Sequence, residues 1–169
     1  HYDKLVRTAN LSPQIVEGLL KMRERFPKLA EELSISILNS KSDENKWRLL
    51  TYASPSIQDR ARNAALNVTT DKDKPDLERV GAMALLGKEY VNQLSSLLRS
   101  SSSIEIQTAV IDQLSKVSSF EKILESWPGF EPLIKNSAEN AFLSKEDGTE
   151  VLIDGLKDGK INPVELTSS

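Results

Sequence analysis

Apolar residues recur along nearly the whole chain at the three- and four-residue spacing of helices that bury one face. Ser12 and Pro13 suit the cap and first turn of one helix, and Pro27 begins the next. A short third helix follows, and Ser54 and Pro55 start a fourth. Strand patterns are absent from the sequence. The core positions expected in these four helices are Ile15, Leu19, Met22 and Phe26; Leu29, Leu33 and Ile37; Trp47 and Leu50; and Ile57, Ala61, Ala64, Ala65 and Val68.

A pair of helices recurs three times in the second half of the chain. The first helix of each pair is expected in 76–88, 104–117 and 133–144, and the second in 91–98, 120–127 and 151–156. The first helices are spaced by 28 and then 29 residues, and a two-helix repeat of this length is typical of an α-solenoid. Small residues at a shared place would let neighbouring helices approach closely. The aligned positions are Arg79, Gln107 and Asn136; Gly81, Ala109 and Ala138; and Leu86, Leu114 and Leu143.

Polar and Pro- or Gly-containing segments separate the helices. Thr69–Pro75 is the longest clear interruption and the expected seam between the N-terminal helices and the regular repeats. Ser103 is a candidate cap after the run Ser100–Ser103, Pro128 and Gly129 stop one helix, and Asp147–Gly148 precede the last one. The sequence therefore predicts one all-α domain over 1–169, an α-α superhelix of the HEAT or ARM kind, less regular in 1–70 and regular in 75–166.

Length and charge narrow the classes of function. A chain of 169 residues can bury a sizeable core without a metal or a disulfide. The absence of cysteine excludes disulfides, thiolate metal sites and cysteine nucleophiles. Positive and negative residues are interspersed, with a net charge of −3, so we expect no nucleic-acid partner. No apolar run approaches the roughly 18 residues of a membrane helix, so we expect no direct membrane insertion.

The segment Asp154–Glu165 resembles a calcium-binding loop at several positions. Asp154, Asp158, Gly159 and Glu165 occupy the first, fifth, sixth and twelfth places, and Ile161 the eighth. The third place, where calcium needs an oxygen ligand, is Leu156, which belongs to the apolar stripe of Leu152 and Ile153. We therefore expect no calcium site, but a helix that ends at Gly159 with Asn162-Pro163 opening another turn.

Other acidic residues are expected to be solvated. Asp71, Asp73 and Asp76 lack a turn glycine and alternate with Lys72 and Lys74, which favours an exposed loop over a cation site. Glu121 and Glu125 share a helix face, with Lys122 beside them, so a catalytic carboxylate pair is disfavoured. Asn67-Val68-Thr69 matches the glycosylation pattern, which we interpret as chance on a helix end.

Residues suited to catalysis are scarce. The single His is His1, so Ser-His and metal-His arrangements lack a second member. Trp127 follows Phe120, Ile123 and Leu124 at helical spacing, so we expect it, like Trp47, to pack in the core. The sequence therefore predicts a protein that is not an enzyme, with no catalytic, cofactor-binding or metal-binding residues and no cofactor.

The segment 127–166 resembles the HEAT-type helical tail of large bacterial dehydrogenases. These membrane-associated or exported proteins, found in planctomycetes and their relatives, join a glucose/sorbosone-type propeller to a c-type cytochrome domain. The resemblance weakens across 75–126 to that of a generic helical repeat, and the Asp and Arg ladder of standard HEAT repeats is poorly kept. The positions that match the family are Trp127, Pro128, Pro132, Ala138, Ala141, Leu152, Leu156, Gly159, Lys160 and Ile161.

The resemblance implies a connecting module without the family's catalytic or haem residues, because the chain has no Cys-x-x-Cys-His motif and no propeller pattern. It also implies an exported or periplasmic location. We expect a scaffold, spacer or protein-interaction module of a larger exported redox protein, whose partners are neighbouring domains or another protein. The alternative is a free-standing adaptor that binds a peptide or protein on its concave face. Because residue 1 is His rather than Met, we expect the chain to be processed or cut from a longer protein.

Overall fold

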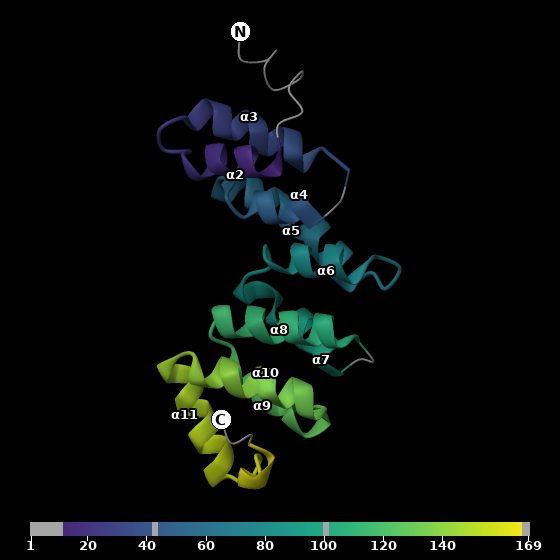
Figure 1. Ribbon diagram of the computed structural model, residues 1–169, viewed down its shortest axis with the longest axis vertical. Coiled ribbons are helices and arrows are strands. Elements are labelled where there is room, and N and C mark those ends of the chain that lie inside the picture. Colours follow the sequence, from purple (N-terminus) through teal and green to yellow (C-terminus); the bar gives the residue numbers. More distant parts are fainter. Residues whose placement is uncertain (1–11, 42–43, 100–101, 167–169) are drawn as a thin grey trace. The chain divides into compact units, whose positions relative to one another are not determined.

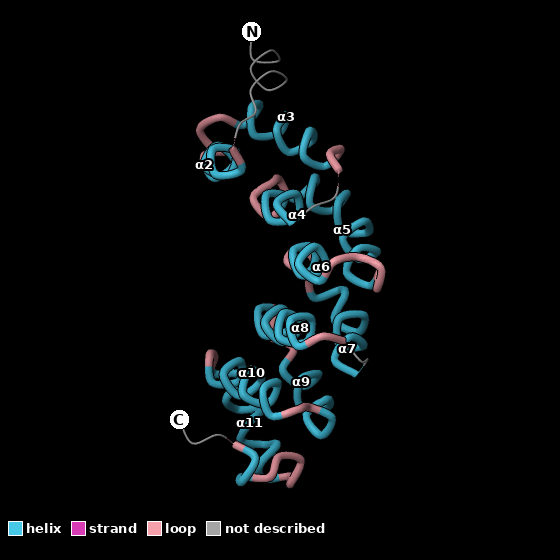
Figure 2. Tube along the Cα trace, turned by 45° about the vertical axis from the view of Figure 1, so that its right-hand side comes forward, coloured by secondary structure: helices cyan, strands magenta, loops and turns pink. Residues whose placement is uncertain are grey.

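The computed structural model describes residues 12–41, 44–99 and 102–166, and every regular element within them is a helix (Figure 2). Figure 1 labels the helices along the chain. Short 3₁₀ turns occupy Lys88–Tyr90, Trp127–Gly129 and Pro163–Glu165. The α-helices are α2 (Pro13–Lys21), α3 (Pro27–Leu38), α4 (Glu44–Leu50), α5 (Pro55–Thr70), α6 (Asp76–Met83), α7 (Val91–Arg99), α8 (Ile104–Lys116), α9 (Phe120–Ser126), α10 (Pro132–Leu143) and α11 (Glu146–Lys157).

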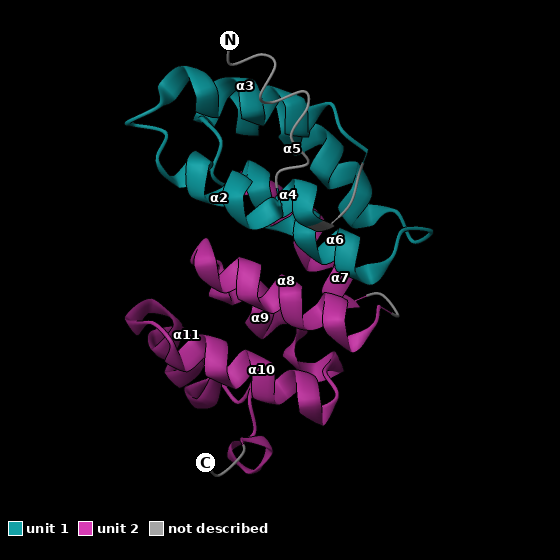
Figure 3. Cartoon of the chain, turned by 45° about the horizontal axis from the view of Figure 1, so that its top comes forward, with its two compact units in different colours: residues 1–85 teal, residues 86–169 magenta. Residues whose placement is uncertain are grey.

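The chain forms two compact units, residues 1–85 and 86–169, coloured separately in Figure 3. This boundary lies beyond the seam expected at Thr69–Pro75. Helix α5 runs through Thr70, and the loop after it connects α5 to α6, which packs against α5 within unit 1. The polar segment is therefore a turn inside unit 1.

Within each unit the helices pack in two rows. In unit 1, α2, α4 and α6 contact one another in sequence along one row, and α3 contacts α5 along the other. In unit 2, α7, α9 and α11 form one row, while α8 and α10 form the other. Helices that follow one another along the chain also pair across the rows, as in α7 with α8 and α10 with α11. Each helix pair thus packs on the next pair within its unit.

Several predicted helix starts are confirmed. Pro13, Pro27 and Pro55 each stand in the first turn of a helix, where a missing N–H costs nothing. Ser103 caps α8, since its hydroxyl accepts a hydrogen bond from the backbone N–H of Ile106 at 3.3 Å. Trp47 lies on the short helix α4 and is 1% exposed.

The prediction that the stripe of the first helix lies in the core is wrong. Helix α2 ends at Lys21 rather than near Phe26, because Phe26 precedes Pro27 and a residue before proline is disfavoured in helical conformation. The helix buries Leu20 instead, which packs with Ala30, Leu33 and Leu49. Leu19 is only half-buried, and the other three stripe residues are exposed: Ile15 at 53%, Met22 at 43% and Phe26 at 42%.

The repeat alignment also needs one correction, in its third unit. Leu143 is 54% exposed, whereas Phe142 beside it is completely buried. The first helices therefore repeat every 28 residues throughout, and the extra residue falls outside them. Gly81 and Ala109 are half-buried, and the fully buried positions lie one residue later than expected in those two helices. The buried positions that repeat are Ala82, Val110 and Ala138, and Leu86, Leu114 and Phe142.

Other differences concern helix ends and single positions. The helix expected in 76–88 ends at Met83, and the final helix begins at Glu146, so that Asp147 and Gly148 lie in its first turn rather than before it. Ala64 and Ile153 are exposed rather than buried.

Gly148 sits at a close crossing of helices in unit 2. A Cβ atom at this position would lie 2.5 Å from the carbonyl oxygen of Phe142 and 2.8 Å from Cε1 of Phe120. The first atom belongs to the backbone and the second to a fully packed ring, so neither yields easily. The absence of a side chain at Gly148 therefore allows α11 to approach α9 and α10.

We predict that Gly148→Ala destabilises the protein by about 1–3 kcal/mol, because the added methyl overlaps the Phe142 carbonyl and the Phe120 ring. The matched control is Gly18→Ala in α2, where nothing lies within 4 Å of the new Cβ, and helix propensity should stabilise by about 0.5–1 kcal/mol. Urea unfolding of both variants measures the difference. Equal effects of the two substitutions would show that the crossing is not close.

A second substitution tests the row contact between α8 and α10. Ala138 is completely buried on α10, so Ala138→Leu should overfill this contact and destabilise by about 1–3 kcal/mol. Asn140→Leu, on the exposed face of the same helix, should change stability by less than about 0.5 kcal/mol. An unchanged melting temperature for Ala138→Leu would place this residue outside the contact.

Candidate functional site

Long basic side chains close the C-terminal ends of helices. Lys46 on α4 donates from Nζ to the carbonyls of Leu38 and Ser40, at 2.8 and 2.9 Å, at the end of α3. Lys145, just before α11, donates to the carbonyl of Ser115 at 2.7 Å, at the end of α8. The last carbonyls of a helix lack intrahelical donors and carry partial negative charge. These cations therefore satisfy helix ends and join neighbouring helix pairs.

Two polar side chains at the repeat position of Arg79 also bind backbone. Arg79 is 6% exposed and donates from Nε to the carbonyl of Thr69 at 3.1 Å. Gln107, its counterpart in the next repeat, donates from Nε2 to the carbonyl of Ser102 at 2.9 Å. Both side chains thus tie a helix to the segment before it. The position is structural in both repeats, although the residue type changes.

An ion-pair network connects α2 and α4. One oxygen of Glu17 pairs with Nζ of Lys21 at 2.6 Å, and the other pairs with Nη1 of Arg48 at 2.5 Å. The hydrogen bond from Lys21 lowers the pKa of Glu17, and the same bond raises the pKa of Lys21. The Lys21 ammonium also lies 4.9 Å from the centre of the Tyr52 ring. Glu17 thus pairs with both cations, and Lys21 contacts both Glu17 and Tyr52.

Glu165 joins the C-terminal turn Pro163–Glu165 to Trp127 and to Lys135 of α10, within unit 2. Its Oε2 accepts a hydrogen bond from the indole N–H of Trp127 at 2.9 Å, and its Oε1 pairs with Lys135 at 2.9 Å. The Trp127 hydrogen bond, followed by Lys135, lowers the pKa of Glu165 below its ordinary value of 4.5. We call these three residues the Glu165 clasp. Sequence reasoning missed the clasp, because Glu165 lies 38 residues after Trp127 along the chain.

The segment that resembles a calcium loop folds as a helix end. Asp154 lies within α11 and pairs with Lys157 at 3.1 Å, while Asp158 pairs with Lys160 at 3.3 Å. Gly159 has a φ of +69°, and the two N–H groups after it bind the carbonyl of Gly155. The expected glycine cap is confirmed, as is the turn opened by Asn162, whose side chain accepts from the Val164 N–H at 3.2 Å.

The remaining candidates of the sequence are placed as follows. Glu121 is exposed, and Glu125 pairs with Lys122 at 2.9 Å and with Arg99 at 3.5 Å. The Asp71 carboxylate accepts from the N–H of Asp73, which forms a local turn. Trp127 is 1% exposed, so its expected place in the core is confirmed.

The glycosylation pattern, the acidic residues and the lengths of the helices complete the description of the candidate sites. Asn67 and Thr69 of the glycosylation pattern lie on α5. Among the described residues, no three His, Cys, Asp or Glu side chains gather as a metal site would require. Within the same residues, no helix is both long enough and apolar enough to cross a membrane. His1 lies outside the described residues.

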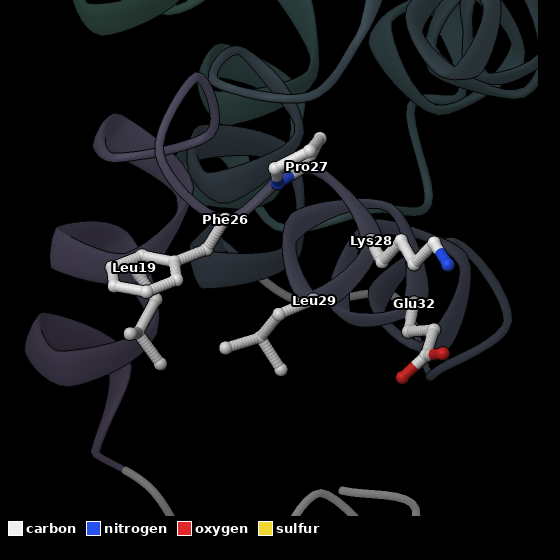
Figure 4. Close-up of a pocket in the computed structure, with 6 residues that line it drawn as sticks. All are labelled: Leu19, Phe26, Pro27, Lys28, Leu29 and Glu32. Atoms are coloured by element: carbon white, nitrogen blue, oxygen red, sulfur yellow. The ribbon is translucent and has the colours of Figure 1, made fainter.

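A largely apolar surface depression of unit 1 lies between α2 and α3. Figure 4 shows the side chains of Leu19, Phe26 and Leu29 converging on it, with Lys28 and Glu32 along one flank. We call this feature the α2/α3 groove, and its volume is about 450 Å³. Of the exposed stripe residues, Ile15 is on the same helix as Leu19 and Met22 directly follows that helix. Exposed large apolar side chains in a cluster are characteristic of interaction surfaces.

Unit 2 has a groove of different character. It lies beside α7 and the 3₁₀ turn Trp127–Gly129, has a volume of about 670 Å³, and includes the charged side chains of Arg99, Glu125 and Glu131. Gln107 contributes its amide, which is hydrogen-bonded to Ser102. We call this the unit 2 polar groove.

No family model, curated protein or solved structure matches the chain. The resemblance of residues 127–166 to the helical tail of exported dehydrogenases therefore stays a prediction.

We predict that Glu165→Gln lowers the melting temperature most above pH 4.5, where the wild-type carboxylate is ionised in both the folded and the unfolded chain. Because folding lowers the pKa of Glu165, its stabilising contribution is present above this pH and is lost as the pH falls through the folded pKa. The difference between wild type and variant should therefore shrink in acid. Thermal unfolding from pH 3 to pH 7 measures it, with Glu150→Gln, an exposed carboxylate on α11, as the control. A difference that is constant with pH would contradict the clasp.

Proposed function

We propose that this chain is a non-catalytic helical-repeat module that holds neighbouring domains or proteins at a defined separation. The observation that carries the proposal is the packing of helix pairs in two rows within each unit. Stacked repeats of this kind are stiff along their length and present surfaces to partners. We further propose that the rows belong to an α-α superhelix of the HEAT or ARM kind.

The use of polar side chains supports a structural role. Lys46, Lys145 and Arg79 bind backbone carbonyls, Glu17 is held between Lys21 and Arg48, and Glu165 binds Trp127. A catalytic site needs nucleophilic, acidic or basic groups that converge on a substrate. The charged side chains named here converge on helix ends and on each other instead.

The resemblance of residues 127–166 supplies the proposed setting. In an exported dehydrogenase that joins a propeller to a cytochrome domain, a stiff module would fix the distance over which electrons pass. A flexible Gly/Ser linker of equal length would sample a broad range of separations instead.

The proposal is tested by the distance between two labelled residues. The chain has no cysteine, so Glu31→Cys in unit 1 and Glu150→Cys in unit 2 provide the two labelling sites, both exposed. Electron spin resonance should give one narrow distance distribution for a spacer. The control pair, Asp112→Cys and Asn140→Cys, lies within unit 2 and defines the width expected of a rigid body. A distribution for the first pair as broad as that of a flexible linker would contradict the spacer function.

A second role, that of an adaptor for a peptide, is favoured by the unit 2 polar groove. Arg99 has a side chain that is 64% exposed and shares Glu125 with Lys122, so it is available to a carboxylate of a bound peptide. In an adaptor, Arg99→Glu should abolish peptide capture, while Lys116→Glu, exposed at the end of α8, should leave it intact. A spacer would behave identically with either substitution.

A further inference from the structure

The stripe of Ile15, Leu19, Met22 and Phe26 has the spacing of a buried helix face, yet the structure leaves most of it exposed. Helix α2 is rotated so that Leu20 meets the core of unit 1. Leu29 of α3 lies beside the stripe in the α2/α3 groove (Figure 4). Apolar side chains of this size in one patch are costly to expose and indicate a surface that another protein covers.

The flank of the groove carries one charge of each sign. Lys28 and Glu32 are both exposed, one helical turn apart on α3, and lie along the same flank in Figure 4. Among the described residues, neither forms an ion pair or a side-chain hydrogen bond. When a second copy of α3 is placed opposite the first in the reverse direction, the cation of each copy faces the anion of the other.

We propose that the α2/α3 groove is the interface between two copies of this chain, related by a two-fold axis that crosses α3 between Lys28 and Glu32. Such an axis reverses the order of residues along α3 but keeps each flank opposite the same flank of the other copy. Each Lys28 then faces the partner's Glu32, and the apolar part of the groove faces the partner's apolar part. This inference does not depend on the spacer function.

The exposed apolar side chains of the patch come from α2 and from the segment that joins it to α3. Ile15 lies in the first turn of α2, and Phe26 lies past its end, next to α3. Leu29 lies between Lys28 and Glu32 on α3 and is therefore near the axis, so the apolar side chains that line the groove of one copy face those of the other. Large apolar side chains then meet one another, and the charged pairs at the flank fix the orientation.

Sedimentation equilibrium of the full chain over a wide range of concentration tests the interface. Association should give a species of twice the 18.8 kDa monomer mass. Phe26→Glu and, separately, Ile15→Glu should leave only monomer, with circular dichroism showing that each variant is folded. The matched control is Leu77→Glu, which changes a 63% exposed leucine on α6, away from the groove, and should still form the dimer.

Charge reversal tests the two-fold arrangement itself. Lys28→Glu or Glu32→Lys alone places like charges opposite each other twice in the dimer and should weaken association at least about tenfold. The double variant should restore it, and a mixture of the two single variants should form a mixed dimer. Glu31→Lys, which changes the net charge as Glu32→Lys does, should have little effect because Glu31 lies outside the groove.

Three results would overturn the proposal. The first is a chain that remains monomeric at every concentration, which is the result expected if a different protein or another segment covers the stripe. The second is association that survives Phe26→Glu and Ile15→Glu. The third is association that the double charge reversal does not restore.

Discussion

The fold depends on contacts between successive helix pairs, because most of its helices are too short to be stable alone. Helices α4 and α9 have seven residues each, and the longest, α5, has 16. Isolated helices shorter than about 12–15 residues are marginal in water even with favourable sequences. The shorter helices therefore persist only while their apolar faces are covered by the neighbours in their own row and the opposite row.

Close packing of this kind requires both small residues and satisfied helix ends. Gly148 allows α11 to pass close to the Phe142 carbonyl, and Ala138 is completely buried on α10, which packs against α8 and α11. The ends of helices then lie near other helices rather than in water. Lys145 donates to the carbonyl of Ser115, which has no partner within α8 at its C-terminal end. Gln113, 7% exposed, donates to the Leu86 carbonyl at 2.7 Å. At these two places polar side chains thus stabilise the packing by binding backbone carbonyls.

The sequence predicted the helical class and most of the core, because prolines mark helix starts and apolar spacing marks buried faces. It failed where two adjacent apolar residues compete for one place. Leu19 and Leu20 are neighbours in α2, and the predicted stripe included Leu19 where the structure buries Leu20. In α10 the helical spacing indicated the buried Phe142, but the repeat alignment used its neighbour Leu143. Pro27 was the available signal that α2 had to end before Phe26.

The candidate site was less predictable than the fold. The Glu165 clasp joins Trp127 and Glu165, which are 38 positions apart, and no local sequence pattern predicts such a contact. The apolar stripe of Ile15, Leu19, Met22 and Phe26 could be recognised in the sequence. It was predicted to be buried, so the exposed groove beside it was not predicted. The glycine cap at Gly159 was predicted correctly, because the apolar stripe that ends in Leu156 and the glycine after it are local signals of a helix end.

The central claim is that each helix is stabilised by neighbours on both sides, and amide hydrogen exchange of the full chain tests it most directly. In unit 2, α8 and α9 have helices packed on several sides, whereas the main helix contacts of α11 are with α9 and α10. The account predicts that the amides of α8 and α9 exchange most slowly in this unit and those of α11 faster, despite the seven-residue length of α9. Protection that followed helix length alone, with α9 exchanging faster than α11, would contradict it.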